Sequence, residues 1–327
     1  MPKVSVTGWY DKKNTGDESY KLAFPCCFPG IDFVFSDSIQ KADAYVLGGG
    51  DIVGPSFLNL MEPIKEKKTI FSVSVSKNNE YASLKDFSQV FVRDMKSMLV
   101  VSELGAKASF CPDLAFSLTA DSVRGKELIK NYFEKDKSEK YDNVIGVVVN
   151  AHLSPSSSSV AADVYRFENF CFEMAKTIDE TNASFIFIPF GKSLPWDDRI
   201  ANSIVASRCK FWKKNVVIHD EISVQDSLDM ISSLSCMIST RLHSSIFSIV
   251  GGTPFLDITH NHKNKNLLET LRADEFSLPL RVFNHQDAKM RLSQILQMKD
   301  HLSMQVKMIG EEQRQQVKEI TKNVCLI

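Results

Sequence analysis

One short segment limits the folds open to this chain more than any other. It reads Asn143-Val-Ile-Gly-Val-Val-Val149 and is apolar at almost every position. A strand with one solvated face alternates apolar and polar residues, whereas a strand of a parallel sheet is buried on both faces and reads as a continuous apolar run. Parallel strands are joined by crossovers, most often helices. The segment therefore predicts an α/β architecture built on a parallel sheet.

Short apolar runs alternate with amphipathic segments in two series along the chain. The first series predicts strands at residues 4–7, 31–35, 44–47, 69–73, 89–92 and 108–111. The second predicts strands at 143–149, 184–188, 215–218, 236–239 and 254–258. A chain of 327 residues also exceeds the ~250–300 residues at which single hydrophobic cores stop growing. We therefore predict two Rossmann-like domains facing a cleft.

The domain limits follow from where the alternation stops. We place the first domain at residues 1–118, a charged linker at 119–142 and the second domain at 143–285. A polar helical region at 286–327 follows; it can pack back on the first domain, and we expect Gly310 to interrupt it.

Composition excludes several classes of protein. Lysine and arginine number 39 against 40 acidic residues, so no overall field favours nucleic acid. No apolar run reaches the ~18–20 residues of a membrane span, and the amino terminus has no secretory pattern. Seven cysteines show neither zinc nor CxxC spacing. We expect a cytoplasmic protein with reduced thiols and no metal; peripheral membrane contact and oligomeric state stay open.

The most informative motif, Arg241-Leu242-His243, follows the predicted strand 236–239. Ser244 continues it into an apolar helix that ends at a glycine pair. Ligands of open parallel sheets bind beyond the carboxyl ends of the strands. A helix N-terminus beside an arginine suits an anion, and a histidine there can exchange a proton. The alternative is an arginine paired within the protein and a histidine that is only hydrogen-bonded.

Three other cationic residues follow strands of the second series. His152 follows strand 143–149 and enters a serine-rich stretch, Lys192 follows 184–188, and Lys263 follows 254–258. Each can meet an anion at the same edge of the sheet. Exposed lysines and mobile serine-rich loops are the commoner interpretation of such residues.

Two segments of the first series give weaker signals. Asn14 to Glu18 opens a helix, either as a simple cap or as a polar loop in which Asp17 or Glu18 holds sugar hydroxyls. The run Gly48-Gly49-Gly50 lacks the spacing of a dinucleotide or P-loop motif, but Gly49 and Gly50 permit close approach of a ligand. Arg93-Asp94 indicates an ion pair or a helix cap, and Asp113 indicates a cap or a hinge.

Taken together, these motifs resemble the polysaccharide pyruvyl transferase family. The ordered motifs that carry the resemblance are Gly8-Trp9-Tyr10, Asn14 with Gly16-Asp17-Glu18, Leu47-Gly48-Gly49-Gly50, Val92-Arg93-Asp94 with Ser97, Pro112-Asp113, Arg241-Leu242-His243 and Lys263. The resemblance implies a GT-B-like fold, with the acceptor side in the first domain and the donor side in the second.

Two positions depart from the family. An arginine that often follows the first strand of the second domain is replaced by the stretch ending at His152, and a tyrosine before Lys263 is replaced by His260.

The resemblance also implies the reaction, which is transfer of pyruvate from phosphoenolpyruvate to a sugar as a ketal, with release of phosphate. Arg241, Leu242, His243, Ser244 and Lys263 would hold the donor, with His152 or Lys192 supplying the charge of the absent arginine. His243 would be the acid or base, aided by Arg241. Asp17 would act on the sugar hydroxyls, with Asn14, Glu18, Gly49 and Gly50 near the acceptor.

This scheme requires no metal and no cofactor beyond the donor. Two alternatives remain: a glycosyltransferase that uses a nucleotide sugar, and a non-catalytic glycan-binding relative. The acceptor sugar and the polymer it belongs to are not indicated by the sequence.

Overall fold

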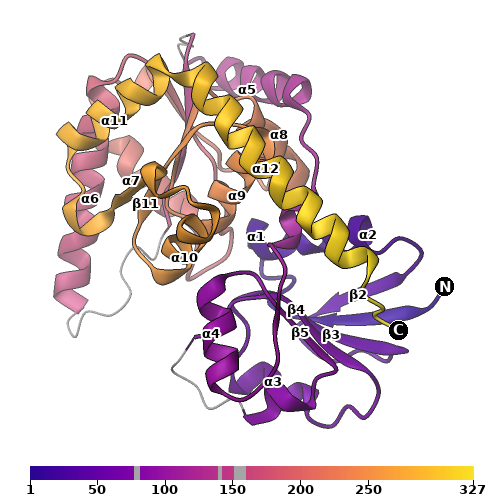
Figure 1. Ribbon diagram of the computed structural model, residues 1–327. Helices are drawn as coiled ribbons and strands as arrows, with labels where there is room; N and C mark the ends of the chain where they lie inside the picture. The colour runs from indigo at the N-terminus through magenta and orange to yellow at the C-terminus, as the bar shows by residue number, and fades with distance from the viewer. Residues whose placement is uncertain (77–81, 139–141, 151–159) are drawn as a thin grey trace. The chain divides into compact units, whose positions relative to one another are not determined.

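The computed structural model describes residues 1–76, 82–138, 142–150 and 160–327. The chain forms two compact units (Figure 1): Met1–Leu118 with Glu311–Ile327, and Thr119–Gly310. Each unit contains one six-stranded sheet, and the neighbouring strands in both sheets are parallel. The predicted fold class, two parallel-sheet α/β domains, is confirmed.

The first unit has the strand order β2-β1-β3-β4-β5-β6. Its strands are β1 Lys3–Thr7, β2 Asp32–Ser36, β3 Ala44–Gly50, β4 Lys68–Val73, β5 Gln89–Val92 and β6 Ser109–Phe110. Its helices are α1 Thr15–Glu18, α2 Tyr20–Cys27, α3 Pro55–Met61 and α4 Met95–Glu103, with 3-10 turns η1 Ala82–Asp86 and η2 Leu114–Ser117.

Alternate residues of the first sheet enter two different apolar layers. On one face, Leu47, Ile70 and Val92 join a cluster with residues of α3 and α4. On the other, Phe71 packs its ring against Phe24 of α2, with the ring centroids 6.2 Å apart. Every residue of β3 is buried, as expected for a central strand covered on both faces.

The second unit has the strand order β12-β11-β10-β7-β8-β9. Its strands are β7 Val144–Val148, β8 Ser184–Phe187, β9 Asn215–Val217, β10 Cys236–Ser239, β11 Phe255–Thr259 and β12 Ser277–Pro279. Its helices are α5 Ser122–Asp136, α6 Val160–Glu180, α7 Asp198–Ser207, α8 Val224–Ser232, α9 Leu242–Gly251, α10 His262–Leu271 and α11 His285–Gln297. Its 3-10 turns are η3 Trp212–Lys214, η4 Asp274–Phe276 and η5 Leu280–Val282, and α12 Lys299–Lys322 begins in this unit.

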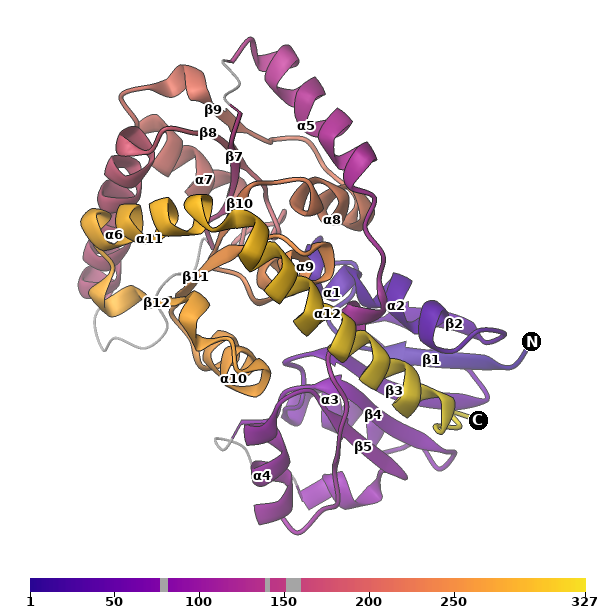
Figure 2. The ribbon, with the colours of Figure 1, turned by 45° about the horizontal axis from the view of Figure 1, so that its top comes forward.

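The helices of the second unit form two groups. Helix α6 packs against α7 and α11, and Figure 1 shows α6 and α11 side by side. Helix α8 packs against α5 and α9, and Figure 2 shows α5 beside α8. Ile145 and Val147 of β7 lie in one core with residues of α6, α7 and α11. The central strand is therefore completely buried, as its apolar run predicted.

The end of the chain differs from our expectation. We predicted that Gly310 would interrupt the C-terminal helical region, and this is wrong, because α12 runs through it without a break. A Cβ atom at residue 310 would lie 2.6 Å from the carbonyl oxygen of Ile249 in α9. The glycine therefore permits close packing between α12 and α9. Beyond it, Glu311–Ile327 groups with the first unit, where Lys67 Nζ donates to the carbonyl oxygen of Cys325 at 2.6 Å.

The segment predicted as a linker, 119–142, contains α5 and groups with the second unit. Gly125 lets α5 lie against α8, since an added Cβ would come within 1.9 Å of the carbonyl oxygen of Asp229. Arg124 also pairs with Asp226 and Asp229. The edge strand β12 was not predicted, because three residues are too short to show a periodic pattern.

Candidate functional site

The candidate site lies where the strand order of the second sheet reverses. The chain enters at β7, adds β8 and β9 on one side, and then adds β10 on the other side of β7. Ligands of open α/β sheets bind at such a switch point. The Oγ1 of Thr240, directly after β10, donates to the Val148 carbonyl oxygen at 2.8 Å and accepts from the Asn150 amide at 2.7 Å. Arg241 therefore follows β10 at the switch point.

Arg241 is the N-cap residue of α9 and is held by one carboxylate. Its Nη2 and Nε lie 2.5 Å and 3.1 Å from the two oxygens of Asp198, the first residue of α7. Asp198 is completely buried and also accepts from the amides of Phe190 and Gly191. The Arg241 side chain keeps 17% of its surface exposed. Within the described residues its Nη1 donates no hydrogen bond, so this edge can meet a ligand.

Gly191 makes this arrangement possible. A Cβ atom at residue 191 would lie 2.7 Å from Nη2 of Arg241 and 2.2 Å from the carbonyl oxygen of Trp196. Any larger residue would displace the guanidinium from its position against Asp198.

His243 lies in the first turn of α9 and is only 9% exposed. A set of serine hydroxyls fixes this turn to the end of β10. Ser239 Oγ lies 2.5 Å from Ser244 Oγ and 2.9 Å from Ser245 Oγ. Leu242, the first residue of α9, is partly buried. The backbone that carries His243 is therefore rigidly placed.

Asp257 of β11 lies beneath this turn and is completely buried. Its Oδ2 accepts from Ser245 Oγ and from Asn264 Nδ2 at 2.7 Å each, and its Oδ1 accepts from Thr259 at 2.9 Å. Thr259 also shares a hydrogen bond with Ser277 of β12. Burial raises the pKa of Asp257 to about 6, although these hydrogen bonds act in the opposite direction. The carboxyl group links α9, α10 and the edge of the sheet.

His260, at the end of β11, lies close to two cationic side chains. Burial, followed by the charges of Arg241 and Lys263, lowers its pKa to about 4, so the ring is neutral near pH 7. Its Nδ1 lies 3.4 Å from the Ile258 carbonyl oxygen, and its Nε2 lies 3.0 Å from the side-chain nitrogen Nδ2 of Asn261. This neutral ring donates from Nδ1 and accepts at Nε2. Arg241 and Lys263 thus both act on the His260 ring through their positive charge.

The other predicted donor residues are placed differently. Lys192 is buried in the loop after β8, where its Nζ donates to the carbonyl oxygen of Ile222 at 2.8 Å. This bond gives the ammonium group a structural partner within the protein. His152 lies outside the described residues.

In the first unit, Asn14 and Glu18 have structural partners. Asn14 caps α1 by accepting from an amide two residues further on. Glu18 accepts from the amide of Asp11 at 2.6 Å and pairs with Lys21 at 2.7 Å. Asp17 is partly exposed on α1.

The glycine run after β3 allows backbone and side chains to approach closely. Gly49 and Gly50 have positive φ angles of 82° and 91°. A Cβ atom at Gly49 would lie 2.4 Å from the ring of Tyr20, and one at Gly50 would lie 2.8 Å from Oδ1 of Asp17. Gly50 therefore brings the carboxylate of Asp17 to the carboxyl end of β3.

Arg93 forms a buried ion pair, as predicted for its motif, but its partner is Asp113, which also caps η2 as predicted. Arg93 Nη1 lies 2.8 Å from Asp113 Oδ2 and 3.0 Å from the hydroxyl of Tyr20, which also donates to Asp113 at 2.7 Å. Asp94 caps α4 instead. These residues connect the ends of β5 and β6 with α2 and have a structural role.

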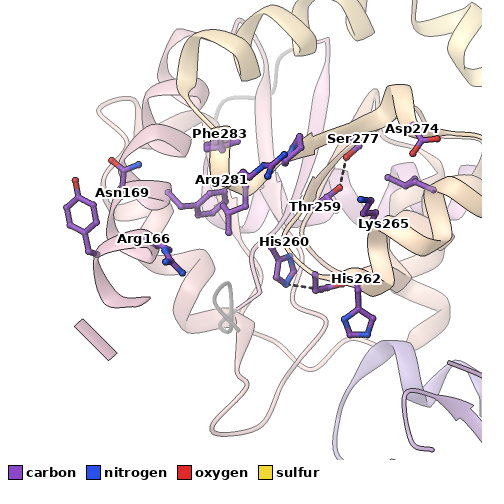
Figure 3. Close-up of a pocket in the computed structure, with 16 residues that line it drawn as sticks. Arg166, Asn169, Thr259, His260, His262, Lys265, Asp274, Ser277, Arg281 and Phe283 are labelled. Carbon is purple, nitrogen blue, oxygen red and sulfur yellow. Dashed lines mark hydrogen bonds between the residues drawn. The ribbon is translucent and has the colours of Figure 1, made fainter. Parts of the chain in front are cut away.

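A pocket of about 830 Å³ adjoins His260 in the second unit (Figure 3). It lies at the carboxyl ends of β11 and β12 and is bordered by α6, α10 and η5. Figure 3 shows Arg166 and Arg281 on different elements around it.

Among the described residues, no group of three or more histidine, cysteine or acidic side chains is arranged to hold a metal ion.

A family model described as polysaccharide pyruvyl transferase matches residues 2–262, which is more than half of the chain. The chain belongs to the polysaccharide pyruvyl transferase family. The matched residues include the Arg241 motif and the two glycine-containing motifs of the first unit, at residues 14–18 and 47–50. The predicted resemblance is therefore confirmed. A comparison with curated proteins finds no match.

Solved structures show the same fold at low sequence identity. S. aureus MnaA, solved with UDP, has a TM-score of 0.65 and 10% identity, covering 100% of this chain and 98% of its own. Anabaena HepE, solved with UDP-glucose, has a TM-score of 0.62 and 9% identity, covering 99% and 100%. The Neisseria meningitidis UDP-GlcNAc 2-epimerase has a TM-score of 0.56 and 12% identity, covering 98% and 99%. This family member therefore has a GT-B fold.

Sequence reasoning missed three residues that shape the site of this family member. Asp198 holds Arg241, Gly191 makes room for it, and Asp257 supports the helix that carries His243. Gly191 lies in the loop after β8 and Asp198 begins α7, in a stretch where only Lys192 was predicted as a site residue. Gly191 and Asp198 both contact Arg241, which is at least 43 residues away in the chain, and no local pattern indicates such contacts. In the part of the chain that the structure describes, no helix is both long and apolar enough for a membrane span.

Proposed function

We propose that this protein transfers pyruvate from phosphoenolpyruvate to a sugar of a glycan, forming a ketal and releasing phosphate. The observation that carries the proposal is the placement of Arg241. It lies at the switch point of the second sheet, at the N-terminus of α9, with one edge of its guanidinium held by Asp198. Family membership supports the reaction class.

Binding of the donor follows from charge. Phosphoenolpyruvate carries nearly three negative charges, and burying them without partners would cost far more than binding returns. Arg241 offers its Nη1 edge, α9 offers the amides of its first turn, and Lys263 adds a second cation toward the position near His260. Asp198 does not touch the donor in this scheme. It is a positioning residue that fixes the orientation of Arg241.

We assign His243 as the acid that protonates phosphoenolpyruvate. His243 gives a proton to the C3 methylene carbon, which leaves C2 cationic. A sugar hydroxyl adds to C2 and loses its proton, the bond from C2 to the phosphate oxygen breaks, and phosphate leaves. A second hydroxyl adds to C2, loses its proton and completes the ketal. We assign Asp17 to orient or deprotonate the sugar hydroxyls.

Phosphate release provides the test. Phosphorus NMR should show phosphoenolpyruvate converted to inorganic phosphate only when a glycan acceptor is present. His243→Ala should retain the fold by circular dichroism and lose about 10²- to 10⁴-fold in turnover, since a placed acid–base group contributes that much. Lys126→Gln, on the exposed side of α5, is the matched control and should keep full turnover. An unaltered rate in His243→Ala would remove His243 from the mechanism.

Thermal stability separates the alternatives. Stabilisation by phosphoenolpyruvate supports the proposal. Stabilisation by UDP-glucose alone would indicate a nucleotide-sugar transferase instead. Stabilisation by glycans without phosphate release would indicate a binding protein that does not catalyse the reaction.

A further inference from the structure

We propose that the pocket beside His260 binds an acidic saccharide segment of the acceptor glycan, with Arg281 holding its carboxylate or phosphate group. This inference rests on the proposed function, because it names the chemical class of the acceptor for the same site. The pocket's volume of about 830 Å³ lies within the ~300–1,000 Å³ range of small-molecule sites.

The charge of the pocket lining is the first argument. Arg166, Lys265 and Arg281 line the pocket, and Asp274 is the single acidic residue among its lining residues in the described part of the chain. Arg166 and Lys265 each have an acidic neighbour on their own helix at 3.6 Å, in contacts that are exposed. Exposed pairs of this kind contribute little and leave the cations available to a ligand. The pocket therefore favours an anion.

The guanidinium group of Arg281 is available to a ligand. It lies on η5 and lines the pocket (Figure 3). It makes no hydrogen bond or ion pair with any residue that the structure describes. A guanidinium group presents five donors in a planar fork that matches carboxylate and phosphate oxygens. Arg281 can therefore supply a bidentate contact to an acidic group in the pocket without losing an internal partner.

The rest of the lining suits a sugar better than a bare anion. Phe170 and Phe283 form an apolar wall, with their ring centroids 5.0 Å apart. Asn169 and Asn261 bring amide groups, and Ser277 brings a hydroxyl group. Pockets for sugar-sized ligands combine apolar and aromatic walls with a few polar groups that fix orientation. A small inorganic ion would leave most of this surface unused.

Location connects the pocket to the reaction. His260 and His262 line the pocket, and Lys263 directly follows His262 in the first turn of α10. The pocket therefore adjoins one of the cations that we assign to phosphoenolpyruvate. The hydroxyls that attack C2 must lie at the donor, so the neighbouring sugar units of the acceptor extend away from it. The pocket places one such unit within reach.

Binding measurements test the proposal without requiring turnover. Isothermal titration compares a glucuronate-containing disaccharide with the neutral disaccharide in which a hydroxymethyl group replaces the carboxylate. Glucose 6-phosphate, inorganic phosphate and UDP-glucose are titrated in parallel. We expect the glucuronate disaccharide or glucose 6-phosphate to bind at least about tenfold more tightly than the neutral sugar, since charge-assisted hydrogen bonds contribute that much. Which of the two binds identifies the acidic group.

Variants locate the binding. Arg281→Gln should weaken binding of the acidic sugar by about tenfold or more, whereas Lys126→Gln, which removes a charge from α5 outside the pocket lining, should leave it unchanged. Equal affinity in wild type and Arg281→Gln would overturn the proposal. So would equal binding of the neutral sugar, binding of inorganic phosphate as tight as either acidic sugar, or Arg281-dependent binding of UDP-glucose alone.

The outcomes also separate this inference from the proposed function. Stabilisation by phosphoenolpyruvate is measured on wild type in the same series. If phosphoenolpyruvate fails to bind while the acidic sugar binds through Arg281, the donor assignment is wrong and the pocket assignment holds. If phosphoenolpyruvate binds and the acidic sugar does not, only the pocket assignment is wrong.

Discussion

Asp257→Asn removes a titratable group from beneath α9 with little change in shape. In the wild-type protein, Oδ2 accepts from Ser245 and Asn264, and Oδ1 accepts from Thr259. An asparagine oxygen can keep the first two bonds. Its amide can donate to the Thr259 hydroxyl, which can in turn donate to Ser277. The substitution therefore changes mainly the protonation behaviour of a completely buried side chain.

The expected effect on stability follows from the pKa of Asp257. Burial raises it from 3.8 to about 6. Because the folded pKa is above the unfolded one, the carboxyl group favours the folded state at low pH, and this contribution is lost as pH rises through about 6. A shift of about two pKa units corresponds to about 3 kcal/mol, of which about 2 kcal/mol falls between about pH 4.5 and 7.5. The asparagine variant has no such loss. Its free energy of unfolding should therefore rise relative to wild type by about 2 kcal/mol across this range.

Urea unfolding at a series of pH values measures this difference. Trp196 and Trp212 belong to the second unit and Trp9 to the first, so both proteins carry Trp9→Phe and fluorescence reports the second unit. His260, with a pKa of about 4, is present in both proteins and its titration cancels in the difference. A difference that stays constant with pH would show that the Asp257 carboxyl is not perturbed by burial. A difference that falls as pH rises would show that the fold stabilises its charge, and either result refutes the reasoning.

Three further substitutions test the packing and the site. Gly310→Ala should destabilise the protein by about 1–3 kcal/mol in urea unfolding through overpacking against α9; helix propensity alone predicts a gain of about 1 kcal/mol, so the sign of the change decides between them. Tyr20→Phe should cost about 1–3 kcal/mol in the same assay, because Arg93 loses a buried partner; no loss would show that the buried network does not need this hydroxyl. Asp198→Asn should weaken binding of phosphoenolpyruvate in isothermal titration, and this loss should vanish when Arg241→Gln is also present. Additive effects of Asp198→Asn and Arg241→Gln would contradict the positioning role.

Much of the fold could be predicted because the relevant signals are local. The apolar run at β7 and the alternation of strands and helices indicated two parallel sheets, and the residues after β10 were correctly placed at the start of a helix. The errors arose where contacts with residues distant in the sequence determine the local structure. The prediction that Gly310 interrupts the helix was wrong, because close packing against Ile249 explains a glycine within a continuous helix. The edge strand β12 was missed because its pairing with β11, rather than its own three residues, defines it.

The amino-acid sequence by itself determined the α/β class, the family and the Arg241 motif, because hydrophobic periodicity and ordered motifs are properties of neighbouring residues. Tertiary structure alone decided what these residues contact. It brought Asp198 to Arg241 and placed Asp257 under α9, and it assembled Arg281 with Arg166 around one pocket. These arrangements depend on how strands are ordered in a sheet and on which helices cover it, and such long-range packing is not encoded in any local pattern.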